Sequence, residues 1–104
     1  MPAAPWMKSV AYHRLAENEM IESASFYERR RRFLGERFLD EIEKTLAKIH
    51  KNPDLGQPGK CHTRSWKVKR FPFRIVYLEQ TKRIWIVAVA HLSRKPDYWL
   101  ERMN

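Results

Sequence analysis

The stretch Arg70-Phe-Pro-Phe-Arg-Ile-Val-Tyr77 and the apolar run Ile84 to Ala90 decide the fold of this chain. Both are rich in β-branched and aromatic residues, and only the short link Glu79-Gln80-Thr81-Lys82 follows the first strand, so together they predict a β-hairpin. We expect the first strand over Phe73 to Glu79. The second is apolar throughout, which is typical of a central strand covered on both faces.

A further strand is predicted just before this hairpin. Ser65-Trp-Lys-Val-Lys69 alternates, which sends Trp66 and Val68 to one face of the sheet and the two lysines to the other. By the same rule, Arg74 shares the face of Val76 and Leu78. The segment Asp54 to Lys60, which contains two glycines and a proline, is expected to be the loop that leads into these strands.

The first half of the chain predicts two helices. Apolar residues recur at helical spacing from Leu15 to Tyr27, and the polar run Arg29 to Arg32 ends the pattern. Leu34, Phe38, Ile42, Leu46 and Ile49 then follow one face of a second helix, which Asn52-Pro53 terminates. Because only a few residues separate the two, we expect an antiparallel helix hairpin.

The order of elements indicates an α+β fold. A short strand is expected over Met7 to Tyr12, followed by the two helices, the three later strands and a short helix over Pro96 to Met103. We therefore predict a mainly antiparallel four-stranded sheet with the helix hairpin packed on one face and a partly open, basic face opposite. Residues 7–104 are expected to form a single domain, and residues 1–6 a disordered extension.

Composition limits the kinds of function. The chain has 104 residues, with 21 Lys and Arg against 12 Asp and Glu, giving a net charge of +9. Such an excess favours phosphate backbones, acidic proteins or anionic surfaces as partners. The single cysteine, Cys61, excludes an internal disulfide and fits a reducing cytoplasm. We expect no secretory signal, no membrane segment, no metal site and no cofactor.

Several motifs in a fixed order resemble a known family. The pattern Arg-Phe-Pro-Phe-Arg-Ile-Val-Tyr, followed by His91-x-x-Arg-x-Pro-x-Tyr-Trp99, is similar to that of the RelE/ParE superfamily of type II toxin-antitoxin toxins. The likeness extends upstream through Leu15-Ala-Glu17, Leu34-Gly-Glu-Arg-Phe-Leu39 and Asn52-Pro53. It covers nearly the whole chain from Met7 onward and implies the same α+β fold and a cognate acidic antitoxin as partner, in a toxin-antitoxin hetero-oligomer.

The resemblance also implies a candidate catalytic site, if the chain is a nuclease of the RelE type. Ribosome-dependent members that cleave messenger RNA use strand lysines, a strand arginine, and an arginine with a tyrosine near the C-terminus. Cleavage through the 2′-hydroxyl requires a base, cations around the phosphorane and an acid for the leaving oxygen. The side chains that could fill these roles here are Lys67, Lys69, Arg74, His91, Arg94 and Tyr98.

Each candidate has a possible chemical role and a purely structural alternative. The forked guanidinium groups of Arg74 and Arg94 suit a phosphate clamp, and the imidazole of His91 is the natural acid or base among the six. The lysines could equally be a solvated face, and Arg74 could pair with a tail carboxylate such as Asp97. His91 could be a hydrogen-bonded strand end, and Tyr98 with Trp99 could simply anchor the tail, which is the interpretation we prefer for Trp99.

Three functions follow from the resemblance. The residue pattern of the motifs more closely resembles the ParE-like, plasmid-stabilisation branch. This resemblance favours a growth-inhibiting toxin that poisons DNA gyrase without catalysis of its own. The alternative is a ribosome-dependent mRNA endonuclease that uses the site above. A third possibility is a non-toxic homologue that only binds its antitoxin.

Overall fold

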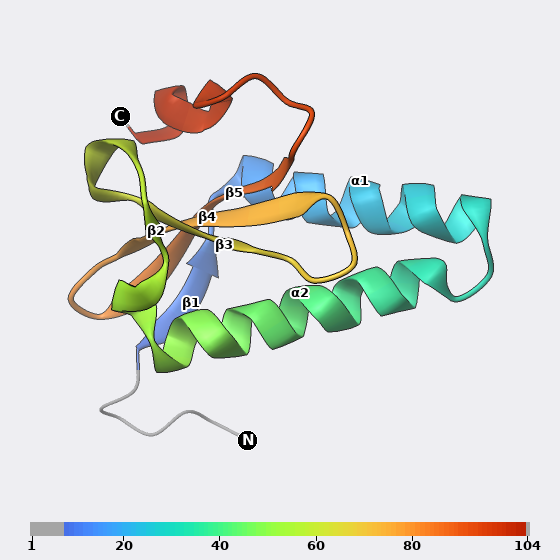
Figure 1. Cartoon of the computed structure of the whole chain (residues 1–104), viewed down its shortest axis with the longest axis horizontal. Coiled ribbons are helices and arrows are strands. Elements are labelled where there is room, and N and C mark those ends of the chain that lie inside the picture. The colour runs from blue at the N-terminus through green and yellow to red at the C-terminus, as the bar shows by residue number, and fades with distance from the viewer. Residues whose placement is uncertain (1–7, 104) are drawn as a thin grey trace.

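Two α-helices and a five-stranded sheet form the main elements of the described part of the chain (Figure 1). The structure, a computed structural model, describes residues 8–103, so the extension expected over residues 1–6 lies outside the described part. Strand β1 (Ser9–Tyr12) leads into helix α1 (Arg14–Arg30) and helix α2 (Leu34–Lys51). The later elements are η1 (Pro53–Leu55), β2 (Gln57–Pro58), η2 (Lys60–His62), β3 (Arg64–Lys67), β4 (Phe73–Glu79), β5 (Arg83–His91) and η3 (Tyr98–Met103).

The sheet has the order β1-β5-β4-β3-β2, with β1 parallel to β5 and every other neighbour antiparallel. The four expected strands are all present, so the α+β prediction is confirmed. The fifth strand, β2, is a two-residue addition inside the segment expected to be a loop. It pairs Gln57 with Ser65 and Pro58 with Arg64 at the sheet edge, where a proline leaves no ladder bond unmade.

Strand β3 is shorter than the sequence pattern predicts. It ends at Lys67, and the chain then turns back through Arg70, whose backbone is left-handed with φ of 70°. The Val68 N–H still bonds to the Phe73 carbonyl oxygen at 2.9 Å, which closes the turn. The expected strand to Lys69 was therefore two residues too long, because turn geometry overrides the alternation of the last lysine.

Strand β5 is buried on both faces, and a β-bulge interrupts its pairing with β4. Val76 lies opposite Ala88 while Tyr77 lies opposite Ile86, so Val87 is an extra residue without a partner on β4. Ile86 packs with the helix-side core, whereas Val87 and Ala88 pack on the opposite side. This confirms that the apolar run is a strand covered on both faces.

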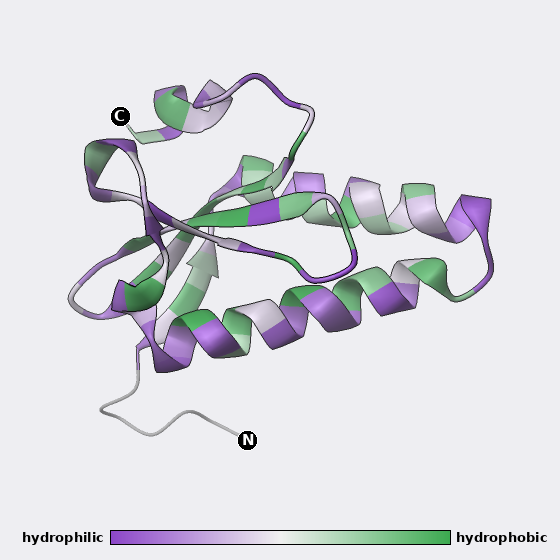
Figure 2. Ribbon diagram, in the orientation of Figure 1, coloured by the Kyte–Doolittle hydropathy of each residue, from purple (hydrophilic) through white to green (hydrophobic). Residues whose placement is uncertain are grey.

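The main core lies between the helix hairpin and the sheet. α2 contributes its buried stripe of Phe38, Ile42 and Ile49, and α1 contributes the fully buried Ala16 from its first turn. Full burial of each large side chain of this kind stabilises the fold by roughly 1.5–3 kcal/mol. In Figure 2 the apolar colour runs along β4 and β5, while both helices alternate between apolar and polar residues.

The terminal segment covers part of the other face of the sheet. Trp99 in η3 is only 6% exposed and packs with Val76, Val87 and Ala88 in a smaller second cluster. The expected terminal helix is thus present as a 3-10 helix, and the anchoring role preferred for Trp99 is confirmed. Between this tail and strands β2 and β3 the face stays open.

Candidate functional site

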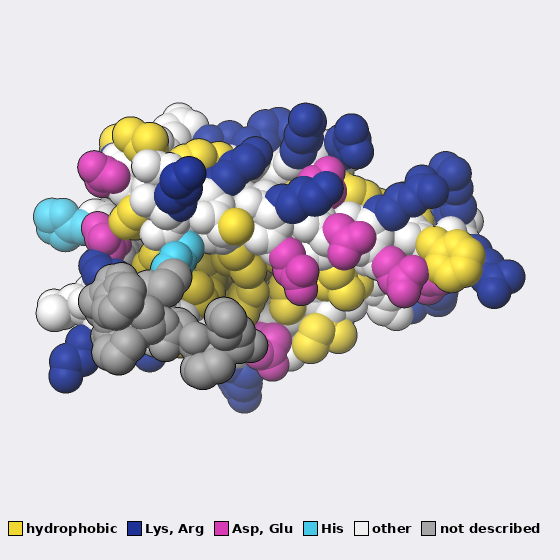
Figure 3. Space-filling model, turned by 90° about the horizontal axis from the view of Figure 1, so that it is seen from below, with side chains coloured by type: hydrophobic (Ala, Val, Ile, Leu, Met, Phe, Trp, Pro, Cys, Tyr) yellow, Lys and Arg dark blue, Asp and Glu magenta, His cyan; other side chains and the backbone are white. Residues whose placement is uncertain are grey.

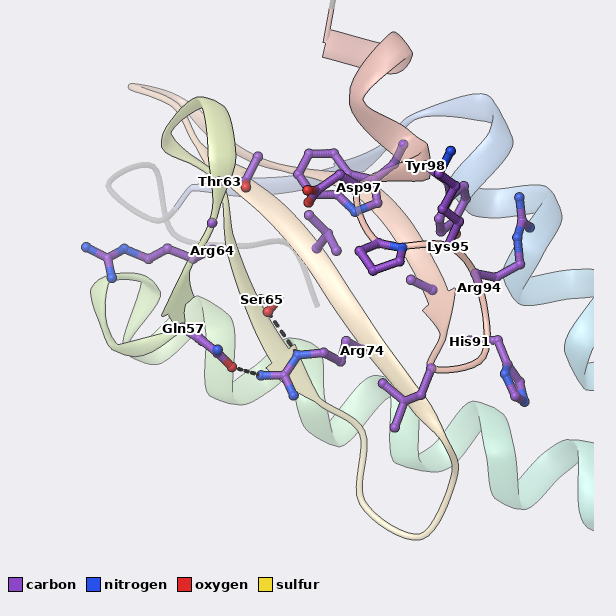
Figure 4. A pocket seen from close by; sticks show the side chains of 16 residues that line it. Gln57, Thr63, Arg64, Ser65, Arg74, His91, Arg94, Lys95, Asp97 and Tyr98 are labelled. Atoms are coloured by element: carbon purple, nitrogen blue, oxygen red, sulfur yellow. Dashed lines mark hydrogen bonds between the residues drawn. The ribbon is translucent and has the colours of Figure 1, made fainter.

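A hollow of about 360 Å³ opens on the sheet face between the tail and strands β2 and β3 (Figure 4). Its floor is apolar and includes Val76, Ala90 and Trp99. Its rim carries the cationic side chains of Arg64, Arg74, Arg94 and Lys95. We call this feature the open-face hollow. Its lining includes a single carboxylate, Asp97, and the Lys60 Nζ lies 3.1 Å from that carboxylate.

Arg74 enters the open-face hollow from β4, as its alternation with Val76 predicted. Its guanidinium donates to the Ser65 Oγ at 3.0 Å and to the Gln57 Oε1 at 2.5 Å. Both acceptors are neutral, so these hydrogen bonds do not compensate the positive charge of Arg74. The pairing with Asp97 that the sequence allowed is wrong, because Asp97 pairs with Lys60 instead.

Arg94 lies on the opposite side of the open-face hollow from Arg74 (Figure 4). Its guanidinium carbon sits 3.9 Å above the centre of the Tyr98 ring, a cation-π contact. The two arginines therefore occupy the two ends of one concave surface and do not converge on a single point. Such spacing suits an extended anionic ligand better than one isolated phosphate.

Tyr98 is held by a carboxylate from α1. Its hydroxyl donates to the Glu19 Oε2 at 2.6 Å. Burial, together with this bond to a charged acceptor, raises the pKa of Tyr98 far above its ordinary value. A phenol in this state holds its proton tightly, so Tyr98 serves to orient neighbouring groups and is poorly placed to exchange protons at neutral pH.

His91 ends β5 at the point where the open-face hollow meets a second groove along α1. Its Nδ1 accepts a hydrogen bond from the Ser93 backbone N–H at 3.0 Å, and its ring packs edge-on against Phe73. The accepting Nδ1 leaves Nε2 to carry the proton of the neutral ring. The sequence allowed either a structural or a chemical role for His91. These contacts are those of the structural role, a hydrogen-bonded residue at the end of a strand.

The two candidate lysines lie in different places. Lys67 is the cross-strand partner of Arg74, so the two side chains share the open face. Lys69 follows the end of β3 and lines a separate groove beside α2, with Glu41 and Lys44. The structure thus brings Arg74, His91, Arg94 and Tyr98 to one hollow and Lys67 to its edge, and it separates Lys69 from them.

Sequence reasoning missed Glu19, the centre of the polar network under the tail. Besides Tyr98, its carboxylate accepts from Arg102 Nη1 at 2.9 Å and Nη2 at 2.8 Å, and from the Val89 backbone N–H at 3.1 Å. Burial alone would raise the pKa of Glu19, but the hydrogen bonds from Arg102, Tyr98 and Val89 outweigh it, so the pKa lies below its ordinary value. A carboxylate three residues after buried Ala16 was the available signal.

The other predicted features are more limited. Residues 8–103 contain no group of His, Cys, Asp and Glu side chains placed to hold a metal ion. Within the same range, neither α1 nor α2 has the apolar character that a membrane-crossing helix needs. Cys61 is exposed.

Comparison of the sequence with family models identifies the family of this chain. Residues 10–96 match the family model described as the ParE toxin of the type II toxin-antitoxin system parDE. The chain belongs to the ParE toxin family. This confirms the predicted resemblance and its ParE-like branch, and a parDE system implies an antitoxin as the partner of the toxin.

A solved structure supports the ParE fold. One chain of the structure titled "Chromosomal ParDE TA system from P. aeruginosa" matches with a TM-score of 0.67 and 19% identity, covering 84% of this chain and 98% of that chain. At this identity the likeness establishes the fold. No curated protein matches the chain.

Proposed function

We propose that this ParE-family toxin inhibits growth by binding DNA gyrase and blocking it, without cleaving a substrate itself. Its place of action is then the cytoplasm. One observation supports this over catalysis: Arg74 and Tyr98, two of the polar side chains of the open-face hollow, are engaged in hydrogen bonds within the fold. Arg74 bonds to Gln57 and Ser65, and the Tyr98 hydroxyl bonds to Glu19.

A toxin that blocks its target by binding needs a different kind of surface from a nuclease. A nuclease needs a base and an acid that exchange protons near neutral pH, within reach of one phosphate. A binding surface needs charge, apolar area and rigidity. The open-face hollow offers the second set, with four cationic side chains on its rim over an apolar floor. This supports a toxin that acts by binding.

We propose a cognate acidic antitoxin as the neutralising partner, in a toxin-antitoxin hetero-oligomer. The net charge of +9 favours an anionic partner that covers basic and apolar surface with an added helix or strand. Because such contacts steer association electrostatically, the association rate should fall as salt rises.

Messenger RNA cleavage is the second candidate function, and one observation favours it. Arg74, His91, Arg94 and Tyr98, which come from three different parts of the chain, all line the same hollow. An RNA strand lying across this hollow would meet a guanidinium at each end and an imidazole beside it. In that case the candidate catalytic residues are Lys67, Arg74, His91, Arg94 and Tyr98, whereas Lys69, which the sequence also offered, lines a separate groove beside α2.

A paired assay distinguishes the two targets. Purified toxin is added to gyrase with relaxed plasmid, and separately to a translation extract with a defined message. We expect loss of supercoiling and accumulation of cleaved DNA in the first, with intact message in the second. Absence of any effect on gyrase at micromolar toxin would refute the proposal. Message cleavage that Arg74→Ala and Arg94→Ala abolish would establish the nuclease instead, and inactivity in both assays would indicate a homologue that only binds its antitoxin.

A further inference from the structure

The end of the helix hairpin carries an exposed cluster of phenylalanine and arginine that the open-face site does not use. We call it the hairpin tip, and it consists of Phe26, the four consecutive arginines Arg29 to Arg32, and Phe33. In Figure 1 both helices extend past the sheet, so the tip projects from the body of the molecule. Figure 3 shows a hydrophobic surface at this end of the molecule with Lys and Arg side chains around it.

Phe33 is placed unfavourably for folding alone. Its backbone is left-handed, with φ of 69°, a conformation in which glycine or asparagine is the usual residue. The residue is also 51% exposed. The turn itself is required, because a Cβ on Gly35 would lie only 2.5 Å from the Ala24 carbonyl oxygen, so α2 starts in close contact with α1. An aromatic ring at position 33 adds nothing to that requirement.

The charges of the hairpin tip are also left without carboxylate partners. None of the ion pairs found within residues 8–103 includes an arginine of the tip. The nearby Glu28 is committed to the backbone, since its carboxylate accepts from the N–H groups of Phe33 at 2.9 Å and Gly35 at 3.1 Å. Glu28 therefore caps the start of α2 and does not pair with the arginines of the tip.

Guanidinium groups and aromatic rings are arranged as pairs on this surface. The guanidinium carbon of Arg30 lies 4.9 Å from the centre of the Phe26 ring, and that of Arg32 lies 4.7 Å from the Phe33 ring. Phe26 is 45% exposed. Each pair presents an apolar disc beside a forked cation, the combination that is enriched at the centres of protein interfaces.

From these observations we infer that the hairpin tip is a docking surface for the protein target of the toxin, separate from the open-face hollow, and that it fits an acidic surface with an apolar recess that receives Phe33. The inference rests on the proposed function for the identity of that target, DNA gyrase. Carboxylates of the target would accept from Arg32 and its neighbours, which neutralises the uncompensated charge. Burial of the Phe33 ring would offset the strain at its backbone.

Phe33→Asn and Arg32→Ser test this inference in the full chain. Asparagine tolerates a left-handed backbone, so Phe33→Asn should unfold at the same or a higher temperature than the wild type. The matched controls are Leu55→Asn, another exposed apolar residue, and Arg83→Ser, whose guanidinium stacks on Trp85 at 4.9 Å away from the tip. Affinity for purified gyrase is measured by biolayer interferometry, alongside inhibition of supercoiling.

We expect both tip variants to weaken gyrase binding by about tenfold or more, the size of a hot-spot truncation, while both controls stay near the wild-type value. Equal binding and inhibition by Phe33→Asn, Arg32→Ser and the wild type would overturn the inference. So would tip variants that lose affinity for bare duplex DNA while gyrase binding is unchanged, because the tip would then be a nucleic-acid surface.

Growth after induced expression separates this inference from the proposed function. If the wild type does not bind gyrase, the proposed target is wrong. The tip assignment still stands, with another protein as target, if the wild type and Arg83→Ser arrest growth and Phe33→Asn does not. Equal arrest by Phe33→Asn, or no arrest by the wild type, overturns the tip assignment itself.

Discussion

Replacing Glu19 should loosen the attachment of the tail to the body of the toxin. Its carboxylate joins three parts of the chain, since it accepts hydrogen bonds from Tyr98 and Arg102 of η3 and from the Val89 backbone of β5. Glu19→Ala removes all of these acceptors at once. The guanidinium of Arg102 then retains only the Val87 carbonyl oxygen, at 3.0 Å.

The size of the effect follows from the burial of the pair. The side chain of Glu19 is 16% exposed and that of Arg102 is 10% exposed, so the charge left behind is largely shielded from water. Breaking a buried pair of this kind costs about 3–5 kcal/mol, and partial access of water places the expected loss near 3 kcal/mol. Small domains have total stabilities of about 5–15 kcal/mol, so the change should be large.

Denaturant unfolding of Glu19→Ala, Arg102→Met and the double variant measures this prediction. The free energy of unfolding should fall by about 3 kcal/mol in Glu19→Ala. The double-mutant cycle should return a coupling energy of about 1–3 kcal/mol between the two side chains. A loss below about 1 kcal/mol, or sites that behave additively, would refute the assignment of Glu19 as the centre of the network.

The same carboxylate predicts a pH dependence. Because the folded pKa of Glu19 lies below its ordinary value, its stabilising contribution is complete above the pKa of an unfolded glutamate, about 4.3. It is lost as the pH falls from there through the lower folded value. In Glu19→Gln this part of the acid-induced loss should disappear, so its stability should change less than that of the wild type over this range. Parallel curves for the two proteins would contradict the reasoning.

Two other substitutions test close packing. Gly35→Ala should lower the free energy of unfolding by about 1–2 kcal/mol despite the better helix propensity of alanine, because the new Cβ would meet the Ala24 carbonyl oxygen at 2.5 Å; an unchanged unfolding midpoint would argue against that contact. Tyr77→Phe should lower it by about 1 kcal/mol, because the buried hydroxyl donates to the Pro53 carbonyl oxygen at 2.6 Å. Amide exchange at Leu55 should then be faster in the variant, and equal protection would show that the bond does not hold η1.

The periodic parts of the fold could be predicted because they depend on neighbours along the chain. The stripe from Leu34 to Ile49 fits α2 within a few residues, and the strand over Phe73 to Glu79 has the predicted bounds. Turns limited this accuracy. The turn that contains the left-handed backbone of Arg70 ends β3 earlier than its alternation predicts. Strand β2 forms because it can pair with β3 at the edge of the sheet.

The candidate site was only partly visible in the sequence. Alternation placed Arg74 on the open face, and the spacing after β5 delivered Arg94 and Tyr98 to the same hollow. The partners that hold these side chains were not visible. Glu19 is separated from Val89 by 70 residues and from Arg102 by 83, distances at which no local pattern carries information.

The sequence by itself determined the α+β class, the ParE-like family resemblance and the excess of positive charge. These properties depend on composition and on patterns among residues that are close together in the chain. The tertiary structure alone decided which charges are neutralised and which stay free. Glu19 and Glu28 are both glutamates of α1. The first binds Arg102 under the tail, whereas the second caps α2. Glu19 meets donors 70 to 83 residues away because the tail packs on the sheet, and Glu28 meets the backbone N–H groups of the turn between the helices. With these carboxylates engaged, the open-face hollow and the hairpin tip stay positively charged.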